Sequence, residues 1–103
     1  MKEFNKLVRD RIPEIIKANG ETPHFHAIED DEKYLQALLQ KDVEEGIELA
    51  QDLSLEELAD KLEVIYAITK ARGYTREQLE QTRAEKAKKR GGFDKRIFLE
   101  YTD

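Results

Sequence analysis

The placement of proline constrains this chain more than any other feature. Both of its prolines, Pro13 and Pro23, lie in the first quarter of the 103 residues. Proline removes a backbone N–H donor and clashes with the preceding helical turn, so it interrupts helices. The chain that follows Pro23 carries no such interruption. It is therefore free to form long helices.

Start and stop signals divide the chain into four predicted helices. Asp10 is expected to cap the first helix, with Pro13 in its first turn and Gly20 after its end. Ser54 with Glu57, and Thr75 three residues before a glutamine, fit the capping-box pattern at two later starts. The sequence thus predicts helices at about 10–19, 30–52, 54–72 and 75–90.

Apolar residues recur at helical spacing along the two central predicted helices. A link of only two residues, Leu53 and Ser54, separates them, so they should pack as an antiparallel hairpin. We predict a single all-α domain over residues 1–103, with this hairpin at the core of a four-helix-type bundle. Residues 24–28 and the tail 93–101 alternate weakly, which adds a minor two-stranded extended element to the expectation.

Charge is abundant and unevenly distributed. Charged residues make up 40% of the chain, yet the formal net charge is only −5. Residues 29–63 carry thirteen acidic and three basic side chains, whereas residues 83–96 carry seven basic and two acidic ones. Two readings stay open: solvated helix faces, or an acidic cation site opposite a basic anion site.

Composition excludes several classes of function. The chain has no cysteine, which removes disulfides, thiolate metal ligands and a cysteine nucleophile. No apolar run is long enough to span a bilayer, and residues 1–10 lack the apolar core of a signal peptide. We therefore expect a cytoplasmic protein without membrane contact. Nucleic acid is a disfavoured partner, since the chain is acidic overall and its basic stretch has few aromatic residues.

Four carboxylates should approach one another across the predicted hairpin. Glu45 falls within the apolar arc of its helix and Glu48 at the arc's edge, while Glu57 and Asp60 border the arc of the next helix. Clustered carboxylates repel one another, and Mg²⁺ or Mn²⁺ with oxygen ligands would offset that repulsion. The competing interpretation makes Glu57 only the capping-box acid of Ser54. It makes Glu44, Glu45 and Glu48 surface acids paired with Lys41 and with neighbours of Asp52.

Histidine does not contribute to this cluster. The two histidines, His24 and His26, lie outside the long predicted helices. Di-iron four-helix proteins take Glu-x-x-His pairs from two helices, so this chain does not fit that class.

The acidic pairs and their flanks resemble a known family. Residues 44–48 (EEGIE) fit the EExxE pattern and residues 57–60 (ELAD) the ExxD pattern of the all-α nucleotide pyrophosphohydrolases, the superfamily of MazG and phosphoribosyl-ATP pyrophosphohydrolase. NKLVRDRIPEII at 5–16, ELADKLEVIYA at 57–67 and KRGGFDKRIFLE at 89–100 are similar to its small phosphoribosyl-ATP-pyrophosphohydrolase-like branch. The similarity covers most of the chain.

This resemblance implies an enzyme. The expected reaction is Mg²⁺-dependent hydrolysis of a nucleoside triphosphate or related nucleotide between the α- and β-phosphates, giving a monophosphate and pyrophosphate. It also implies a homodimer or homotetramer. Carried over by position, the metal ligands would be Glu45, Glu48, Glu57 and Asp60, Glu44 would orient or deprotonate the attacking water, and the substrate-binding bases would be Lys6, Arg9, Arg90, Lys95 and Arg96.

Three residues depart from what this family leads us to expect. Gly46 lies inside a predicted helix, where it costs about 1 kcal/mol relative to alanine. Lys61 follows Asp60 where an apolar residue is usual, and it could pair with Glu57. Asp42 stands where leucine would be less surprising.

A non-catalytic helical interaction module is the alternative function.

Overall fold

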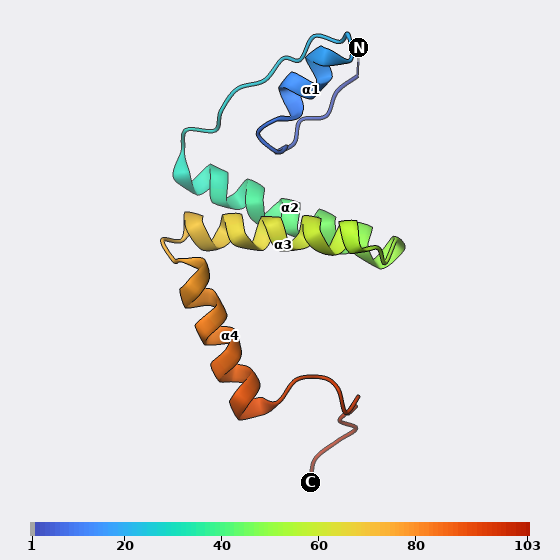
Figure 1. The fold of residues 1–103 in the computed structure, drawn as a ribbon, viewed down its shortest axis with the longest axis vertical. Coiled ribbons are helices and arrows are strands. Elements are labelled where there is room, and N and C mark those ends of the chain that lie inside the picture. The colour runs from blue at the N-terminus through green and yellow to red at the C-terminus, as the bar shows by residue number, and fades with distance from the viewer. Residues whose placement is uncertain (1) are drawn as a thin grey trace.

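The computed structural model describes residues 2–103, and all regular structure within that range is helical (Figure 1). The helices are α1 (Ile12–Ala18), α2 (Asp31–Gln51), α3 (Leu55–Ala71) and α4 (Arg76–Arg90). No helix in the described part of the chain is long and apolar enough to cross a membrane.

The first helix is shorter than predicted, and the expected cap is wrong. Arg11, not Asp10, occupies the N-cap position of α1, and no side chain caps it. The cause is a tight turn in which Ile12 N–H donates to the carbonyl of Arg9 at 3.0 Å, so the helix begins only after Arg11. Pro13 lies in the first turn as predicted.

The expected two-stranded element does not form among the described residues. Residues 24–28 and 93–101 have no regular secondary structure. The first segment precedes α2 and the second follows α4, and Figure 1 shows them in opposite halves of the elongated molecule. Strand pairing requires a separation near 5 Å, which this arrangement does not provide.

Side-chain caps fix the starts of the three longer helices. Asp30 accepts a hydrogen bond from Lys33 N–H at the start of α2, and Ser54 accepts one from Glu57 N–H at the start of α3. At α4 both halves of the capping box form: Thr75 accepts from Gln78 N–H, and the Gln78 side chain accepts from Thr75 N–H. These caps satisfy backbone donors that the helices cannot use internally.

Helices α2 and α3 run antiparallel and lie side by side along most of their length (Figure 1). Leu38 of α2 and Val64 of α3 are the buried apolar residues of the described chain. Helix α4 contacts only α3, and the Arg76 guanidinium lies 4.1 Å from the centre of the Tyr66 ring near the α3–α4 turn. Helix α1 packs against none of the other helices.

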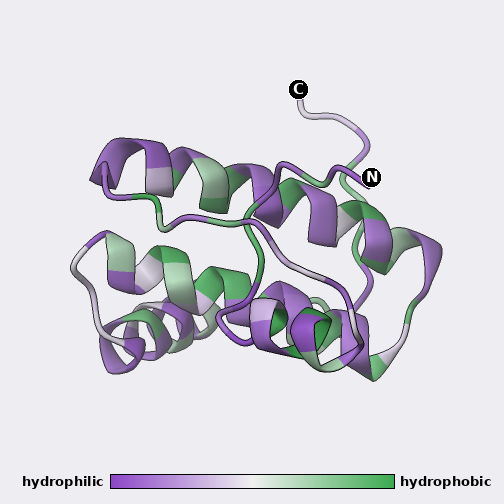
Figure 2. Cartoon of the chain, turned by 90° about the horizontal axis from the view of Figure 1, so that it is seen from above, coloured by the Kyte–Doolittle hydropathy of each residue, from purple (hydrophilic) through white to green (hydrophobic). Residues whose placement is uncertain are grey.

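The described chain is elongated and encloses little apolar surface. Its radius of gyration is 17.9 Å, against about 13 Å for a compact chain of this length. Figure 2 shows hydrophobic residues on the connecting segments as well as on the helices. Half or more of Leu39, Val43 and Ile47 on α2 remains exposed. The apolar arc predicted for this helix is therefore only partly covered.

Candidate metal site

Three carboxylates from the two packed helices meet at one point. Glu45 comes from α2, and Glu57 and Asp60 come from α3; each offers an oxygen, and these oxygens lie within 4.8 Å of one another. Glu57 and Asp60 share a face because residues three apart are neighbours on a helix. The short link between α2 and α3 folds that face back onto Glu45.

Burial makes this cluster costly without a compensating charge. Glu45 is only 5% exposed. Its Oε2 atom and the Oε2 atom of Glu57 are buried and have no hydrogen-bond partner among the described residues. A buried carboxylate oxygen without a partner loses the hydration it has in water, at a cost of several kcal/mol in an apolar setting. The arrangement thus leaves two oxygens available to an external ligand.

Mutual repulsion is visible in the pKa of one member. Burial raises the pKa of Glu57 above its ordinary value of 4.5, and the negative charges of Glu48, Asp60, Glu45 and Asp52 raise it further. Glu48 is the largest contributor among these charges. The raised pKa of Glu57 thus reflects both its burial and the repulsion from neighbouring carboxylates.

Two basic side chains contact the edge of the cluster, each through one carboxylate oxygen of a cluster member. Arg9, from the segment before α1, donates from Nη2 to Asp60 Oδ1 at 2.7 Å. Lys41 Nζ lies 3.4 Å from Glu45 Oε1 and 3.8 Å from Glu44 Oε2. Lys41 thus contacts Glu44 and Glu45, as the competing interpretation of the acidic residues expected.

The three unusual residues of the hairpin turn out to belong to one contact. Lys61 does not pair with Glu57; its Nζ donates to Asp42 Oδ1 at 2.6 Å and to the Asp42 carbonyl at 3.1 Å. A Cβ on Gly46 would lie 3.6 Å from this ammonium. Glycine thus leaves open space beside Lys61. The lysine is held by Asp42 and leaves the three carboxylates without its charge.

The remaining predicted site residues lie farther out. Glu48 is exposed and outside the group of three whose oxygens converge, although its charge acts on Glu57. Glu44 is half-buried beside Lys41. No hydrogen bond or ion pair within residues 2–103 joins the other predicted substrate-binding bases to the cluster. These are Lys6, Arg90, Lys95 and Arg96.

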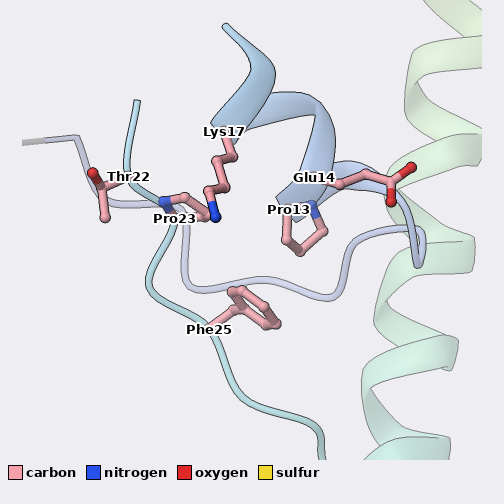
Figure 3. A pocket seen from close by; sticks show the side chains of 6 residues that line it. All are labelled: Pro13, Glu14, Lys17, Thr22, Pro23 and Phe25. Carbon is pink, nitrogen blue, oxygen red and sulfur yellow. The ribbon is translucent and has the colours of Figure 1, made fainter. Parts of the chain in front are cut away.

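A shallow pocket elsewhere shares no residue with this cluster. It lies between α1 and the segment that follows it, and Figure 3 shows the side chains that line it. None is a predicted site residue. The lining residues are Pro13, Glu14, Lys17, Thr22, Pro23 and Phe25. The convergence of carboxylates, not this pocket, therefore locates the candidate site.

The donor set of the cluster fits a hard divalent cation. Its three convergent side chains offer only carboxylate oxygens, which suit Mg²⁺ and Mn²⁺. Two of their oxygens are buried and unpaired. Three carboxylates would leave coordination positions for water, which Mg²⁺ usually retains in its sites.

Comparisons with known proteins bear little on this site. No protein-family model matches the chain, and no solved structure matches it. One curated relative is an uncharacterised protein of Mycolicibacterium smegmatis, 50% identical over 42 residues. The match covers 39% of this chain and 43% of the relative, so it spans less than half the length of either protein.

Proposed function

We propose that the chain is a Mg²⁺-dependent nucleotide pyrophosphohydrolase. The observation that carries the proposal is the buried, unpaired Oε2 of Glu45, whose side chain converges with those of Glu57 and Asp60. These three residues belong to the EExxE and ExxD patterns that resemble the all-α pyrophosphohydrolases. Geometry and motif thus select the same carboxylates.

In this proposal Glu45, Glu57 and Asp60 would hold the cation, with Glu48 as the fourth carboxylate. Glu48 lies close enough to act on the pKa of Glu57, which supports its inclusion. When bound, Mg²⁺ or Mn²⁺ neutralises phosphate charge and lowers the pKa of a coordinated water. The helices fix the positions from which these side chains act.

The protein's remaining groups position water and phosphate. Glu44 lies beside Lys41 at the edge of the cluster. In this proposal its carboxylate would orient or deprotonate the attacking water. That water attacks the α-phosphorus, and the bond from this phosphorus to the bridging oxygen breaks. Pyrophosphate leaves, and Arg9, which pairs with Asp60, would bind its charge.

Four basic residues complete the proposed substrate contacts: Lys6 near the N-terminus, Arg90 at the end of α4, and Lys95 and Arg96 in the segment after it. Gly91 has a φ of 83°, a left-handed backbone that glycine adopts without strain. It redirects the chain directly after α4, and the basic tail begins there. The tail has no packed position among the described residues, so we propose that it takes one when an anionic nucleotide binds.

Pyrophosphate release tests the enzymatic proposal directly. The purified protein would be incubated with a panel of nucleotides, with and without Mg²⁺ or Mn²⁺. We expect metal-dependent release with at least one nucleotide, loss of it in Asp60→Asn, and its retention in Glu63→Gln, an exposed acid one turn away on α3. Absence of release with every nucleotide would contradict the proposal and favour the non-catalytic interaction module.

We also propose that the chain assembles into a homodimer or homotetramer, in which hairpins from different copies complete the four-helix-type bundle. The chain exposes 9993 Å², against about 6,000 Å² for a compact monomer of its mass. An obligate interface removes about 1,000–2,500 Å² from each partner. The excess of about 4,000 Å² therefore accommodates at least one such interface.

The half-exposed apolar row of α2 is the natural place for this contact. Leu39, Val43 and Ile47 follow one another at four-residue spacing and so lie on one side of the helix. Sedimentation should give a dimer or tetramer, and Val43→Glu should shift it toward monomer. Phe25→Glu, at an exposed apolar residue outside the hairpin, is the control. A wild-type protein that stays monomeric at high concentration would contradict self-association.

A further inference from the structure

The two carboxylate oxygens of Glu45 lie in different surroundings. Oε1 faces the Lys41 ammonium at 3.4 Å, whereas Oε2 is buried and has no hydrogen-bond partner within residues 2–103. The side chain of Glu45 is 7% exposed and that of Lys41 is 19% exposed. This pair is therefore far better shielded from solvent than an ordinary surface ion pair.

Helix stability does not account for this pair. In isolated helices a glutamate stabilises more when it precedes a lysine by four residues than when it follows, and here the lysine comes first. Burial of both side chains adds a desolvation cost. A role in holding the carboxylate explains the arrangement better than a contribution to the helix.

We infer that Lys41 is a positioning residue for the cation site. It holds Oε1 of Glu45 and so fixes the carboxylate with Oε2 as the atom left for a divalent cation. The inference rests on the proposed function, because it assigns a role to Lys41 toward that same cation. Residues that hold the non-coordinating atom of a metal-ligating side chain change metal affinity about 10–100-fold when removed.

A competing role for Lys41 predicts the opposite sign. If its ammonium only reduced repulsion among the carboxylates, its removal would take a positive charge away from the site. A divalent cation would then bind more tightly. If the ammonium positions Glu45, its removal leaves both oxygens of a buried carboxylate without a partner, and the cation binds more weakly. The direction of the change thus separates the two roles.

The test is calorimetric titration of the full chain with Mn²⁺. We expect Lys41→Met to weaken binding about 10-fold or more, and Lys41→Arg to restore it to within about 3-fold, because arginine also pairs with carboxylates. Lys33→Met, at an exposed lysine on the same helix, should leave the affinity unchanged. Circular dichroism of each variant checks that its helices are intact.

Each outcome has a distinct meaning. Equal or tighter Mn²⁺ binding by Lys41→Met, with normal binding by the wild type, would overturn the positioning role and leave the proposed function standing. If Lys41→Met loses its helices, the comparison of Lys41→Arg with the wild type decides, and a 10-fold loss there would overturn the inference. No Mn²⁺ binding by the wild type would overturn both proposals.

Discussion

Two polar clusters lie on the same pair of helices, and they differ in whether their charged groups have partners. At Asp42 and Lys61 each charge has a partner from the other helix, and Gly46 leaves space for the ammonium. At Glu45 and Glu57 carboxylate oxygens are buried and unpaired. The two clusters lie only one turn apart along α2.

The contrast shows that acidic composition alone does not explain the convergent cluster. The hairpin can satisfy a carboxylate with a lysine from the opposite helix, as it does at Asp42. At the other cluster Lys41 reaches one oxygen of Glu45, and Arg9 reaches Asp60 from outside the hairpin. The unpaired oxygens are consistent with a ligand that the chain does not itself supply.

The largest expected effect comes from Glu57→Gln, which should raise the stability of the metal-free protein and lower metal-dependent turnover. Removing this charge relieves repulsion, so the metal-free protein should melt at a higher temperature than the wild type. Metal-dependent turnover should fall by more than the roughly 100-fold that loss of an outer-shell partner causes. The cap at Ser54 uses only the backbone of residue 57 and remains intact.

Thermal denaturation and pyrophosphate release, measured on the same preparation of Glu57→Gln, check both effects. The matched control is Glu56→Gln, which removes an exposed charge next to it on α3. A variant that melts lower than the wild type without metal would show that the cluster is not under repulsive strain.

The stability of the metal-free protein should also depend on pH through the carboxyl group of Glu57. The pKa of Glu57 is raised in the folded chain, so the folded state holds a proton that the unfolded state releases near pH 4.5. Stability of the metal-free protein should therefore decline as the pH rises from there through the folded pKa. Urea unfolding across this range should show the decline in the wild type and a flatter profile in Glu57→Gln.

Saturating Mg²⁺ sharpens this measurement. The cation favours the ionised carboxylates, so it should remove the decline and stabilise the protein toward neutral pH. An identical pH profile with and without Mg²⁺ would contradict a cation site at Glu57.

Breaking the satisfied cluster should have a smaller effect of a different kind. Lys61→Met keeps most of the side-chain length but leaves Asp42 without its ammonium, which should cost about 1 kcal/mol of folding stability. Mn²⁺ affinity should stay within about 2-fold of the wild type, since Lys61 touches none of the convergent carboxylates. Urea unfolding and calorimetry measure the two quantities. A large change in affinity without a change in stability would show that the clusters are coupled.

The smallest effect is expected at Gly46. The added methyl group of Gly46→Ala would meet Lys61 Nζ at 3.6 Å, an ordinary contact. Alanine should therefore add up to about 1 kcal/mol of helix stability. Gly46→Leu should instead displace the ammonium and destabilise the protein. Unfolding midpoints of the two variants should thus move in opposite directions, and a loss in Gly46→Ala would mean that the lysine needs the open space.

Local signals in the sequence anticipated the local structure well. Helical periodicity and the caps at Ser54 and Thr75 located the long helices, because each depends on residues within one or two turns. The Asp10 cap was wrong because a backbone turn at Arg9 decided where α1 begins. The strand pairing of residues 24–28 failed because pairing depends on where distant segments lie.

The site was predictable only in part for the same reason. The spacing of Glu57 and Asp60 placed them on one face, and the position of Glu45 in the apolar arc indicated its burial. The pairing of Lys61 with Asp42 rather than Glu57 depended on the register between two helices, which spacing within one helix does not set. The contact of Arg9 with Asp60 joins residues 51 positions apart and had no local signal.

A Mn²⁺ titration followed by electron paramagnetic resonance determines whether the cluster of Glu45, Glu57 and Asp60 binds a divalent cation. The free ion has a strong signal that weakens on binding, so bound and free cation can be counted at each step. We expect the wild type to bind Mn²⁺ saturably. Glu45→Gln should lose this binding, and Glu63→Gln should retain it. A wild-type protein that binds no Mn²⁺, or a Glu45→Gln variant that binds it as tightly, would contradict the assignment of this cluster as a cation site.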